Sequence, residues 1–485
     1  MSLNLDGYKR LNMKRIIALF IVFFTFFSCA YSWNTPDLGD PSIRALSPST
    51  DKKYGKEFMA QLKRQNAIYN DLIVQKYIED LGLKLASHSK DPSRHFNFFV
   101  VRDSTVNAFA GPGGNIGINT GLITYTKNQD ELASVLAHEI AHVTQRHLAR
   151  SIESAERMEI PSIAAVLAAV LTGNGAVASS VISATVAGNM QAYINHTREQ
   201  EKEADRIGIE SLIKSGYNPE GMATLFERMQ KDNDTVLKID LTFLQTHPSY
   251  VTRVADAKNR SNKANQFSRH DSMTFALVQT RIRNARISNP ALASSQYEML
   301  LAKNNSPITQ YAYALALSDN KEYAKASDQM QSLINTHPNN LIFKLTLGEI
   351  NLEGRNYQAG IDALRTSTMI YPYNYSLVLL YGNLLNKDKQ HKAAADYLKP
   401  HYARLKEDTQ FLFLYADALG KSGQLVEAYQ ARSRAFSGLG KTKEAITQLE
   451  LALKQGTPTA YTQTSIQAQL DALQKTLDEG KKRRR

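Results

Sequence analysis

The stretch NQDELASVLAHEIAHV, residues 128–143, decides the fold of the first half of this chain. Asn128 with Glu131 predicts a capped helix start, because each side chain can bond a backbone N–H that the first turn leaves unpaired. Apolar side chains then follow at helical spacing, namely Leu132, Val135, Leu136 and Val143. His138 and His142 stand four residues apart, so both imidazoles lie on the same face of the predicted helix.

The five residues HEIAH, 138–142, indicate a metal site. Two imidazoles on one helix face can bind the same Zn²⁺, and Glu139 then points at the open position of the metal. The alternative interpretation is a surface helix with two solvated histidines. Ile140, Ala141 and Val143 argue against it, because burying unpaired imidazoles in an apolar helix would be costly. The chain has a single cysteine, so the other ligands must be His, Asp or Glu.

A third protein ligand is expected on a second helix, TREQEKEADRIGIESLI, residues 197–213. It offers two acidic pairs at i, i+4: Glu199 with Glu203, and Glu201 with Asp205. The first pair continues into Arg and Glu, which indicates a solvated face. The second continues into Gly and Leu, which indicates half-buried carboxylates in need of a partner. A metal and its histidines would supply that partner, so we assign Glu201 as the third ligand.

The region before the first helix predicts a small sheet. The runs HFNFFVVRD (95–103) and VNAFA (106–110) predict a pair of strands. A glycine turn and the alternating Ile116 and Ile118 follow, which predicts a strand at the border of the sheet. An extended peptide could add itself to this strand, and a plain sheet edge is the alternative. The candidate substrate strand comprises Asn115, Ile116, Gly117 and Ile118.

The second half repeats itself every 34 residues. Two phased columns of small residues show this period: Ala314, Gly348, Gly382 and Ala416, and Ala326, Gly360, Ala394 and Ala428. Small residues where paired helices touch, at this period, resemble the tetratricopeptide repeat, whose helical hairpins stack to bury their apolar faces. We expect four units, from 306 to about 438, in a repeat domain of 306–465. Residues 266–305 are expected to form a linking helical segment, and 466–485 a C-terminal helix with a basic tail.

The N-terminus predicts a secretory signal peptide, residues 1–32. Lys14 and Arg15 precede an apolar run, 16–27, and small residues follow it. This run is short of the roughly 20 residues that span a bilayer as a helix. Lipidation of Cys29 is the alternative. We therefore expect an exported mature chain, beginning with a domain of residues 45–265.

The net charge of +12 does not indicate nucleic-acid binding. Residues 1–32 contribute +3 and the last five residues +5, which leaves +4 for the body of the chain. The sequence shows no basic stripe interleaved with aromatics of the kind that follows a phosphate backbone. Within the uncharged stretch 160–190, the apolar run 163–171 is broken by Thr-Gly-Asn-Gly and is too short to span a membrane. We expect no nucleic acid among the partners and at most peripheral membrane contact.

HEIAH followed about sixty residues later by EKEAD, 201–205, is similar to the zinc metallopeptidase family that includes HtpX and the CAAX prenyl proteases. The signal peptide and the repeat array resemble the soluble periplasmic, BepA-like branch of that family in Gram-negative bacteria. The resemblance implies an α+β zincin-like metalloprotease domain, mainly helical with a small sheet, followed by an all-α tetratricopeptide repeat solenoid. It also implies one Zn²⁺ per chain, bound by His138, His142 and Glu201, with Glu139 as catalytic base and Asp205 assisting.

The resemblance implies a function as well. The chain would be a periplasmic zinc endopeptidase that acts on misfolded or stalled outer-membrane β-barrel proteins, with their assembly machinery as partner. In the BepA-like group a loop histidine can occupy the fourth position of the zinc, which implies that His247 silences the site; otherwise His247 merely precedes a turn proline. The array would raise the local concentration of clients. The alternative is a chaperone or adaptor whose zinc site stays mostly latent.

Three polar residues have expected roles within this interpretation. Glu139 can take a proton from water and hand it to the leaving amine. Asp205 can hydrogen-bond a ligand imidazole or donate to the developing oxyanion, and the sequence leaves both open. His147 lies five residues beyond His142 and off the face of the motif, so we expect an exposed helix residue there.

Overall fold

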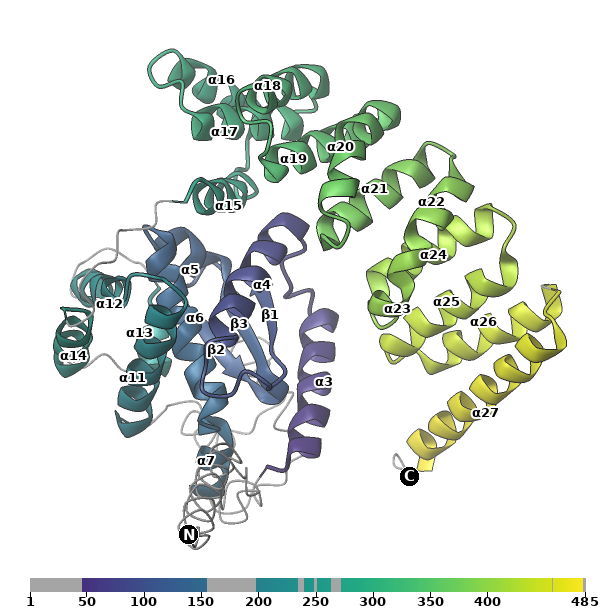
Figure 1. Cartoon of the computed structure of the whole chain (residues 1–485), viewed down its shortest axis with the longest axis horizontal. Helices are drawn as coiled ribbons and strands as arrows, with labels where there is room; N and C mark the ends of the chain where they lie inside the picture. The colour runs from purple at the N-terminus through teal and green to yellow at the C-terminus, as the bar shows by residue number, and fades with distance from the viewer. Residues whose placement is uncertain are drawn as a thin grey trace, which may run out of the picture.

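The computed structural model describes residues 46–154, 198–233, 240–247, 251–262, 272–455 and 457–482. The predicted signal peptide with Cys29, the stretch 160–190 and the last three residues of the basic tail lie outside the described residues. Two parts follow one another along the chain: a mixed helical and sheet part at the N-terminal side, and an array of helices that curves away from it (Figure 1). The predicted α+β part followed by an all-α array is thus confirmed.

The first part is built on a long central helix. Its elements are α3 (Pro48–Arg64), α4 (Leu72–Ala86), β1 (Asn97–Val101), β2 (Ala108–Gly111), η1 (Pro112–Gly114), β3 (Asn115–Asn119), α5 (Thr120–Tyr125), α6 (Gln129–Thr144), α7 (His147–Ser154), α11 (Arg198–Lys214), α12 (Glu220–Asn233), α13 (Thr242–Thr246) and α14 (Val251–Asn262). Helix α6 is buried on all sides from Asp130 to Val143, with α4, α11, α12 and β2 packed around it. Asn128 accepts from the Glu131 N–H at 2.9 Å and the Glu131 carboxylate accepts from the Lys127 N–H at 2.7 Å, as expected for a cap.

The sheet has three strands in the order β1-β3-β2. Strand β3 pairs in parallel with β1 and antiparallel with β2, so the two strands predicted to pair with each other are not neighbours. Gly117 explains why β3 is central, since a Cβ there would lie 2.4 Å from the Phe109 ring and 2.9 Å from the Phe99 ring. The missing side chain leaves room for aromatic rings from both neighbouring strands.

The predicted position of β3 at the border of the sheet is therefore wrong. A strand paired on both sides has no free row of backbone groups, so no peptide can add to it. The correction withdraws the candidate substrate strand, whose four residues are all buried: Asn115, Ile116, Gly117 and Ile118. Their role is structural: the Asn115 side chain donates to the Pro112 and Gly55 carbonyls and ties the strand to α3.

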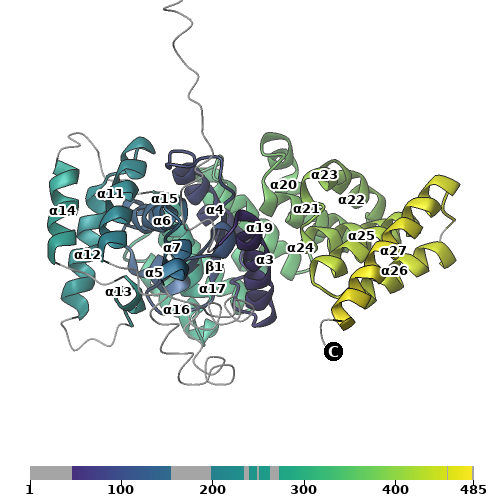
Figure 2. The same cartoon turned by 90° about the horizontal axis from the view of Figure 1, so that it is seen from below.

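The second part consists of helices only. They are α15 (Met273–Asn284), α16 (Pro290–Leu301), α17 (Pro307–Asp319), α18 (Tyr323–Thr336), α19 (Leu341–Glu353), α20 (Tyr357–Ile370), α21 (Tyr375–Lys387), α22 (His391–Leu398), η3 (Lys399–His401), α23 (Tyr402–Leu405), α24 (Thr409–Lys421), α25 (Leu425–Gly438), α26 (Thr442–Gln455) and α27 (Ala460–Lys482). The predicted linking segment contains α15 and α16. From α16 on, neighbouring helices along the chain pack against one another, with α22 packed on α24, up to α27, which lies along α26 at the C-terminal end (Figures 1 and 2).

Each 34-residue unit carries its own folding signals. Small residues sit where helices cross: a Cβ at Gly348 or at Gly382 would approach a leucine methyl of the partner helix to 2.8 Å. The first helix of each unit begins at a capping side chain, in turn Ser306, Asn340, Asn374 and Asp408. Two residues after that helix the chain takes a positive φ, at Lys321, Arg355, Lys389 and Gly423. These positions recur at intervals of 34. The helix caps, the turns and the helix contacts therefore all repeat with the same period.

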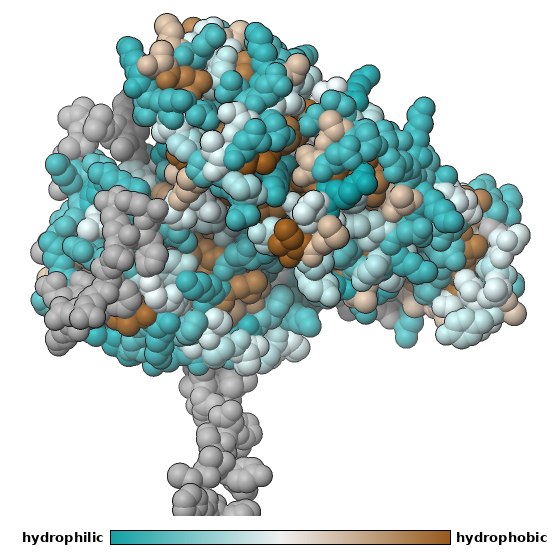
Figure 3. All heavy atoms as spheres, turned by 45° about the horizontal axis from the view of Figure 1, so that its top comes forward, coloured by the Kyte–Doolittle hydropathy of each residue, from teal (hydrophilic) through white to brown (hydrophobic). Residues whose placement is uncertain are grey.

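The two parts touch through α15, whose Gln279 amide donates to the Ile123 carbonyl within α5 and to the Thr126 carbonyl just after it. On the side that faces the array, α3 borders a groove of about 1140 Å³ whose other wall is formed by η3, α23, α25 and α27. Figure 1 shows α3 opposite α23. The face seen in Figure 3 is largely hydrophilic, with hydrophobic residues in small scattered groups. Among the described residues, no helix combines the length and the apolar character needed to cross a membrane.

Candidate metal centre

Two imidazoles on α6 face a common point. His138 and His142 are both buried, and their Nε2 atoms lie 3.0 Å apart. Two such nitrogens cannot both carry a hydrogen at this separation without repelling each other, so at least one lone pair points into the space between them. Glu139, which directly follows His138 in the motif, is fully buried on the same helix.

Helix α11 supplies a carboxylate to the same point. Glu201 is fully buried, with its oxygens 3.4 Å from the Nε2 atoms of His138 and His142. The close approach of the two helices depends on Gly208, where a Cβ would lie 3.2 Å from the α6 backbone at Ala137 and His138. The face of α11 that contains Glu201 and Asp205 is buried, whereas Glu199 on the other face is exposed.

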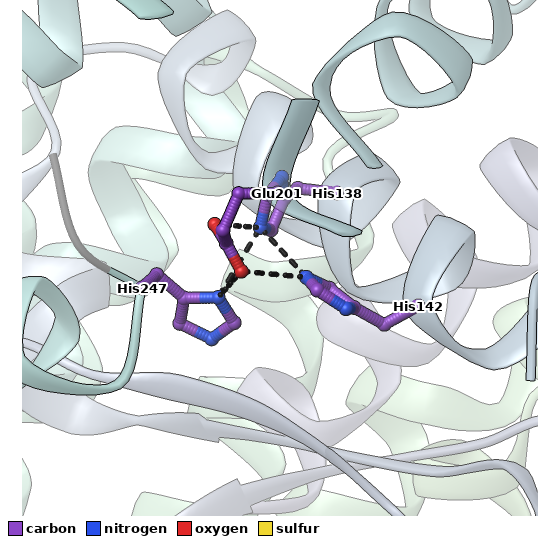
Figure 4. A group of neighbouring side chains, drawn as sticks. All are labelled: His138, His142, Glu201 and His247. Carbon is purple, nitrogen blue, oxygen red and sulfur yellow. Dashed lines mark hydrogen bonds and ion pairs between the residues drawn. The ribbon is translucent and has the colours of Figure 1, made fainter. Parts of the chain in front are cut away.

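A third imidazole comes from the end of α13. His247 Nδ1 lies 3.0 Å from Glu201 Oε1 and 3.3 Å from His138 Nε2. The ring stacks on Phe243 one turn earlier, with centroids 4.6 Å apart, and so is held edge-on to the centre. Figure 4 shows the four side chains pointing toward one another. One ligand atom from each of His138, His142, Glu201 and His247 lies within 4.8 Å of all the others.

This donor set fits a zinc ion. Three imidazole nitrogens and one carboxylate oxygen are ligands that zinc accepts in tetrahedral sites. The Glu139 carboxylate also supports a bound cation. Neither of its oxygens has a hydrogen-bond partner within the described part of the chain, although the group is fully buried. Burial raises the pKa of Glu139. A cation at the centre would stabilise a buried carboxylate that receives no hydrogen bond from the described residues.

Asp205 stands behind His138 rather than in the centre. Its Oδ1 lies 3.0 Å from His138 Nδ1, so the hydrogen of that imidazole sits on Nδ1 and Nε2 is left facing Glu201. Of the two roles left open by the sequence, the geometry favours the hydrogen bond to a ligand imidazole. Without a cation at the centre, burial would lower the pKa of His138, but the carboxylates of Glu201 and Asp205 outweigh burial and raise it to about 9. A metal ion would therefore have to displace a hydrogen from Nε2.

Arg253 on α14 is a residue of this centre to which the sequence assigned no role. Its guanidinium donates to both oxygens of Asp205, at 2.7 and 2.8 Å, and lies 2.8 Å from Glu201 Oε2. It also donates to the His247 carbonyl at 3.4 Å and stacks over the Phe226 ring at 4.6 Å. One signal was available: Arg253 shares a helix face with Ala257, which is also buried. A cation on the apolar face of a helix needs a buried anion.

The prediction that His147 is exposed is wrong. Its side chain is fully buried, with Nδ1 2.7 Å from His142 Nδ1 and Nε2 3.1 Å from Glu203 Oε2. The helical-face argument failed because α6 does not continue to this residue. Arg146 takes a positive φ of 56° and ends the helix, and α7 then starts at His147 in a new direction. Burial lowers the pKa of His147 to about 4, so this imidazole is neutral at physiological pH.

Known proteins resemble this chain over both parts. The profile described as Peptidase family M48 matches residues 73–261, which hold all four candidate ligands. The beta-barrel assembly-enhancing protease of Escherichia coli (strain K12) is 29% identical over 445 residues, which cover 90% of this chain and 91% of that protein.

Two further relatives differ in their coverage. The beta-barrel assembly-enhancing protease of Yersinia pestis is 31% identical over 340 residues, or 69% of this chain and 70% of that protein. The mitochondrial metalloendopeptidase OMA1 of Schizosaccharomyces pombe is 35% identical over 155 residues, covering 32% of this chain and 43% of that protein. The profile match and the Yersinia relative together show that this chain belongs to peptidase family M48, a family of metallopeptidases.

Proposed function

We propose that this protein is a zinc-dependent endopeptidase, with one Zn²⁺ per chain held by His138, His142 and Glu201. The observation that carries the proposal is the convergence of these donors, with His247, within 4.8 Å, beside the buried carboxylate of Glu139, which accepts no hydrogen bond from the described residues. A bound zinc ion would supply Lewis-acid polarisation of a peptide carbonyl and would acidify water.

The residues of the chain would handle the protons. Glu139 follows a ligand on the same helix turn, and neither of its oxygens accepts a hydrogen bond from the described residues, so it would take a proton from the attacking water and pass it to the leaving amine. Burial raises its pKa, which makes this carboxylate a stronger proton acceptor. Asp205 holds the His138 ring through Nδ1, and Arg253 holds Asp205 and Glu201 in place.

His247 would make this centre latent in the arrangement described here. Catalytic zinc sites keep one position open, whereas four protein ligands close it. His247 Nδ1 stands where a fourth ligand would bind, and its Nε2 lies 3.5 Å from Glu139 Oε1. Cleavage would require this imidazole to leave. The same observation favours the second candidate function, a chaperone or adaptor in which the repeat array binds clients while the zinc site stays closed.

The substrates we propose are misfolded or stalled outer-membrane β-barrel proteins in the periplasm, with the machinery that assembles them as partner. Two relatives are named for enhancing β-barrel assembly, and the N-terminal sequence predicts export. The repeat array would hold the client, and the groove beside α3 lies between the array and the metal-binding part. Strand β2 is the sheet edge next to α6, and its Ala110 and Gly111 line a small pocket together with His142.

The test combines zinc analysis with cleavage of an unfolded outer-membrane β-barrel protein by the purified mature chain. We expect one zinc ion per chain, loss of zinc in Glu201→Ala, and retention of zinc with a 10²- to 10⁴-fold lower rate in Glu139→Gln. Glu199→Ala, an exposed change on the same helix, should leave zinc and cleavage unchanged. Latency predicts that His247→Ala cleaves faster than the parent protein.

Two results would contradict these proposals. A parent protein that binds no zinc would exclude the metallopeptidase centre. If zinc binds but neither the parent nor His247→Ala cuts any client, and Glu139→Gln keeps full function in cells, the adaptor is the correct function.

A further inference from the structure

The two histidines of the motif are supported in different ways at their outer nitrogens. His138 Nδ1 meets the carboxylate of Asp205 directly, at 3.0 Å. His142 Nδ1 meets another imidazole, His147, at 2.7 Å. Only beyond that second ring does a carboxylate follow, because His147 Nε2 lies 3.1 Å from Glu203 Oε2. Glu203 therefore stands to His142 as Asp205 stands to His138, with one imidazole inserted between.

The direction of each hydrogen bond in this chain follows from its first member. His142 Nε2 faces the centre, so its hydrogen is on Nδ1, which must donate. His147 Nδ1 then accepts, which leaves the hydrogen of His147 on Nε2, where it is donated to Glu203. Arg150 Nη1 donates to the same Glu203 oxygen at 2.9 Å and fixes the carboxylate from the solvent side. Each of the three donors in this series of hydrogen bonds, on His142, His147 and Arg150, thus has an acceptor.

We propose that His147 is a positioning residue that, with Glu203 and Arg150 behind it, holds the His142 ring and its tautomer for the metal. This inference rests on the proposed zinc site and deepens it. The geometry is hard to explain by packing alone, because an apolar side chain would fill the same buried space without the cost of burying an imidazole. An outer partner of this kind orients a ligand ring and makes its metal-facing nitrogen more basic.

The position of His147 also explains the break between α6 and α7. A residue five positions after His142 on a continuous helix could not reach back to the Nδ1 of that ring. The positive φ at Arg146 turns α7 so that its first side chain lies against His142, with ring centroids 4.7 Å apart. The Arg146 guanidinium donates to the Leu46 carbonyl at 2.7 Å, which anchors this turn.

The experiment measures zinc affinity by competition with a chelator and the visible spectrum of the Co²⁺-substituted protein. His147→Phe keeps an aromatic ring and removes the acceptor, so we expect zinc affinity 10- to 100-fold weaker and a changed Co²⁺ spectrum. His147→Asn places an oxygen where Nδ1 was, so we expect it to restore most of the affinity and the parent spectrum. Glu203→Ala should weaken zinc binding, whereas the matched control on the same helix, Glu210→Ala, should not.

The outcomes separate this inference from the function on which it rests. A parent protein without zinc would contradict the proposed metal centre itself. A parent that binds zinc, with His147→Phe and Glu203→Ala binding it equally well, would overturn the inference and leave the metal centre intact. If Phe and Asn at position 147 weaken zinc to the same extent and lower the melting temperature of the metal-free protein equally, the residue only fills space and the inference is again overturned.

Discussion

Arg253 balances the negative charge on one side of the candidate metal centre. Its side chain is almost wholly buried and faces two buried carboxylates, Asp205 and Glu201. Removing one partner of a buried ion pair is far more damaging than losing a surface pair, because the remaining charge stays in a medium that cannot solvate it. The planar guanidinium also fits Asp205 through two parallel hydrogen bonds, which a lysine cannot reproduce.

We predict that Arg253→Met lowers the free energy of unfolding of the metal-free protein by about 3 kcal/mol, measured by denaturant titration in the presence of a chelator. Arg253→Lys should recover only a part of that loss. As the control, Arg206→Met removes an exposed i, i+4 pair with Glu210 and should cost less than about 0.5 kcal/mol. If Arg253→Met and Arg206→Met lower the free energy of unfolding equally, the buried network contributes no more to stability than an exposed ion pair.

At the scale of single residues, the sequence predicted which side chains share a helix face, because that depends only on local spacing. HEIAH puts two imidazoles on one face wherever the helix goes, and the apolar continuation of the Glu201 face selected that carboxylate over Glu203. The position of His147 could not be predicted, since it depends on a backbone reversal at Arg146 that no proline or glycine announces. Arg253 was missed for a related reason: its partners lie 48 and 52 positions earlier in the chain.

At the scale of elements, the crossing of α6 and α11 determines whether Glu201 reaches the histidines. Gly208 lies at the crossing, against backbone atoms that cannot move aside cheaply. Alanine normally favours a helix over glycine by about 1 kcal/mol, so the two effects oppose each other at this position. Because the close neighbours are backbone rather than a flexible side chain, overpacking should prevail.

We therefore predict that Gly208→Ala lowers the free energy of unfolding by about 1 to 2 kcal/mol and weakens zinc binding as Glu201 moves outward. Gly420 in α24 is the matched control, because a Cβ there meets only the Ala428 methyl at 3.6 Å. Gly420→Ala should stabilise the protein by up to about 1 kcal/mol. Thermal unfolding and chelator competition measure both effects. If both substitutions stabilise the protein, the claim that the crossing of α6 and α11 has no room for a Cβ at position 208 is wrong.

The sheet shows where element prediction failed. The strands themselves follow from alternating apolar residues, but their order depends on pairing between distant segments. The glycine turn before Asn115 and the alternating Ile116 and Ile118 predict a strand at the border of the sheet, whereas Gly117 makes room for Phe99 and Phe109 on both sides. The same missing side chain serves an edge and a crowded central strand equally well, so the sequence alone could not separate them.

For the whole molecule, Arg281 on α15 connects the metal-binding part to the array. Its guanidinium lies 2.8 Å from Asp71, the capping residue of α4, and 2.9 Å from Glu349 of α19. It also donates to Tyr311 and Thr346, both at 3.1 Å. A single cation thus joins a helix of the first part to two helices of the second.

We predict that Arg281→Met loosens the array without disturbing the metal centre. Zinc content should stay at the parent value, while small-angle scattering should give a larger radius of gyration and thermal unfolding should separate into two transitions. Arg283→Met, two residues away on an exposed side chain, should change neither quantity. If Arg281→Met unfolds in one step with unchanged dimensions, the parts are held together by other contacts.

The array was predictable because its signals are local, whereas its docking was not. A period of 34 can be read from small residues alone, and it returns in the caps and turns. The link between Asp71 and Arg281 joins positions 210 residues apart and leaves no periodic trace.

The local start and turn signals of the repeats also bear on how such a protein changes over evolutionary time. Because Ser306, Asn340, Asn374 and Asp408 each begin a helix pair without help from the next pair, duplication or loss of one unit lengthens or shortens the arm by one step. The length of the array can therefore be adjusted by copying a short piece of gene, while the residues of the metal centre are inherited unchanged.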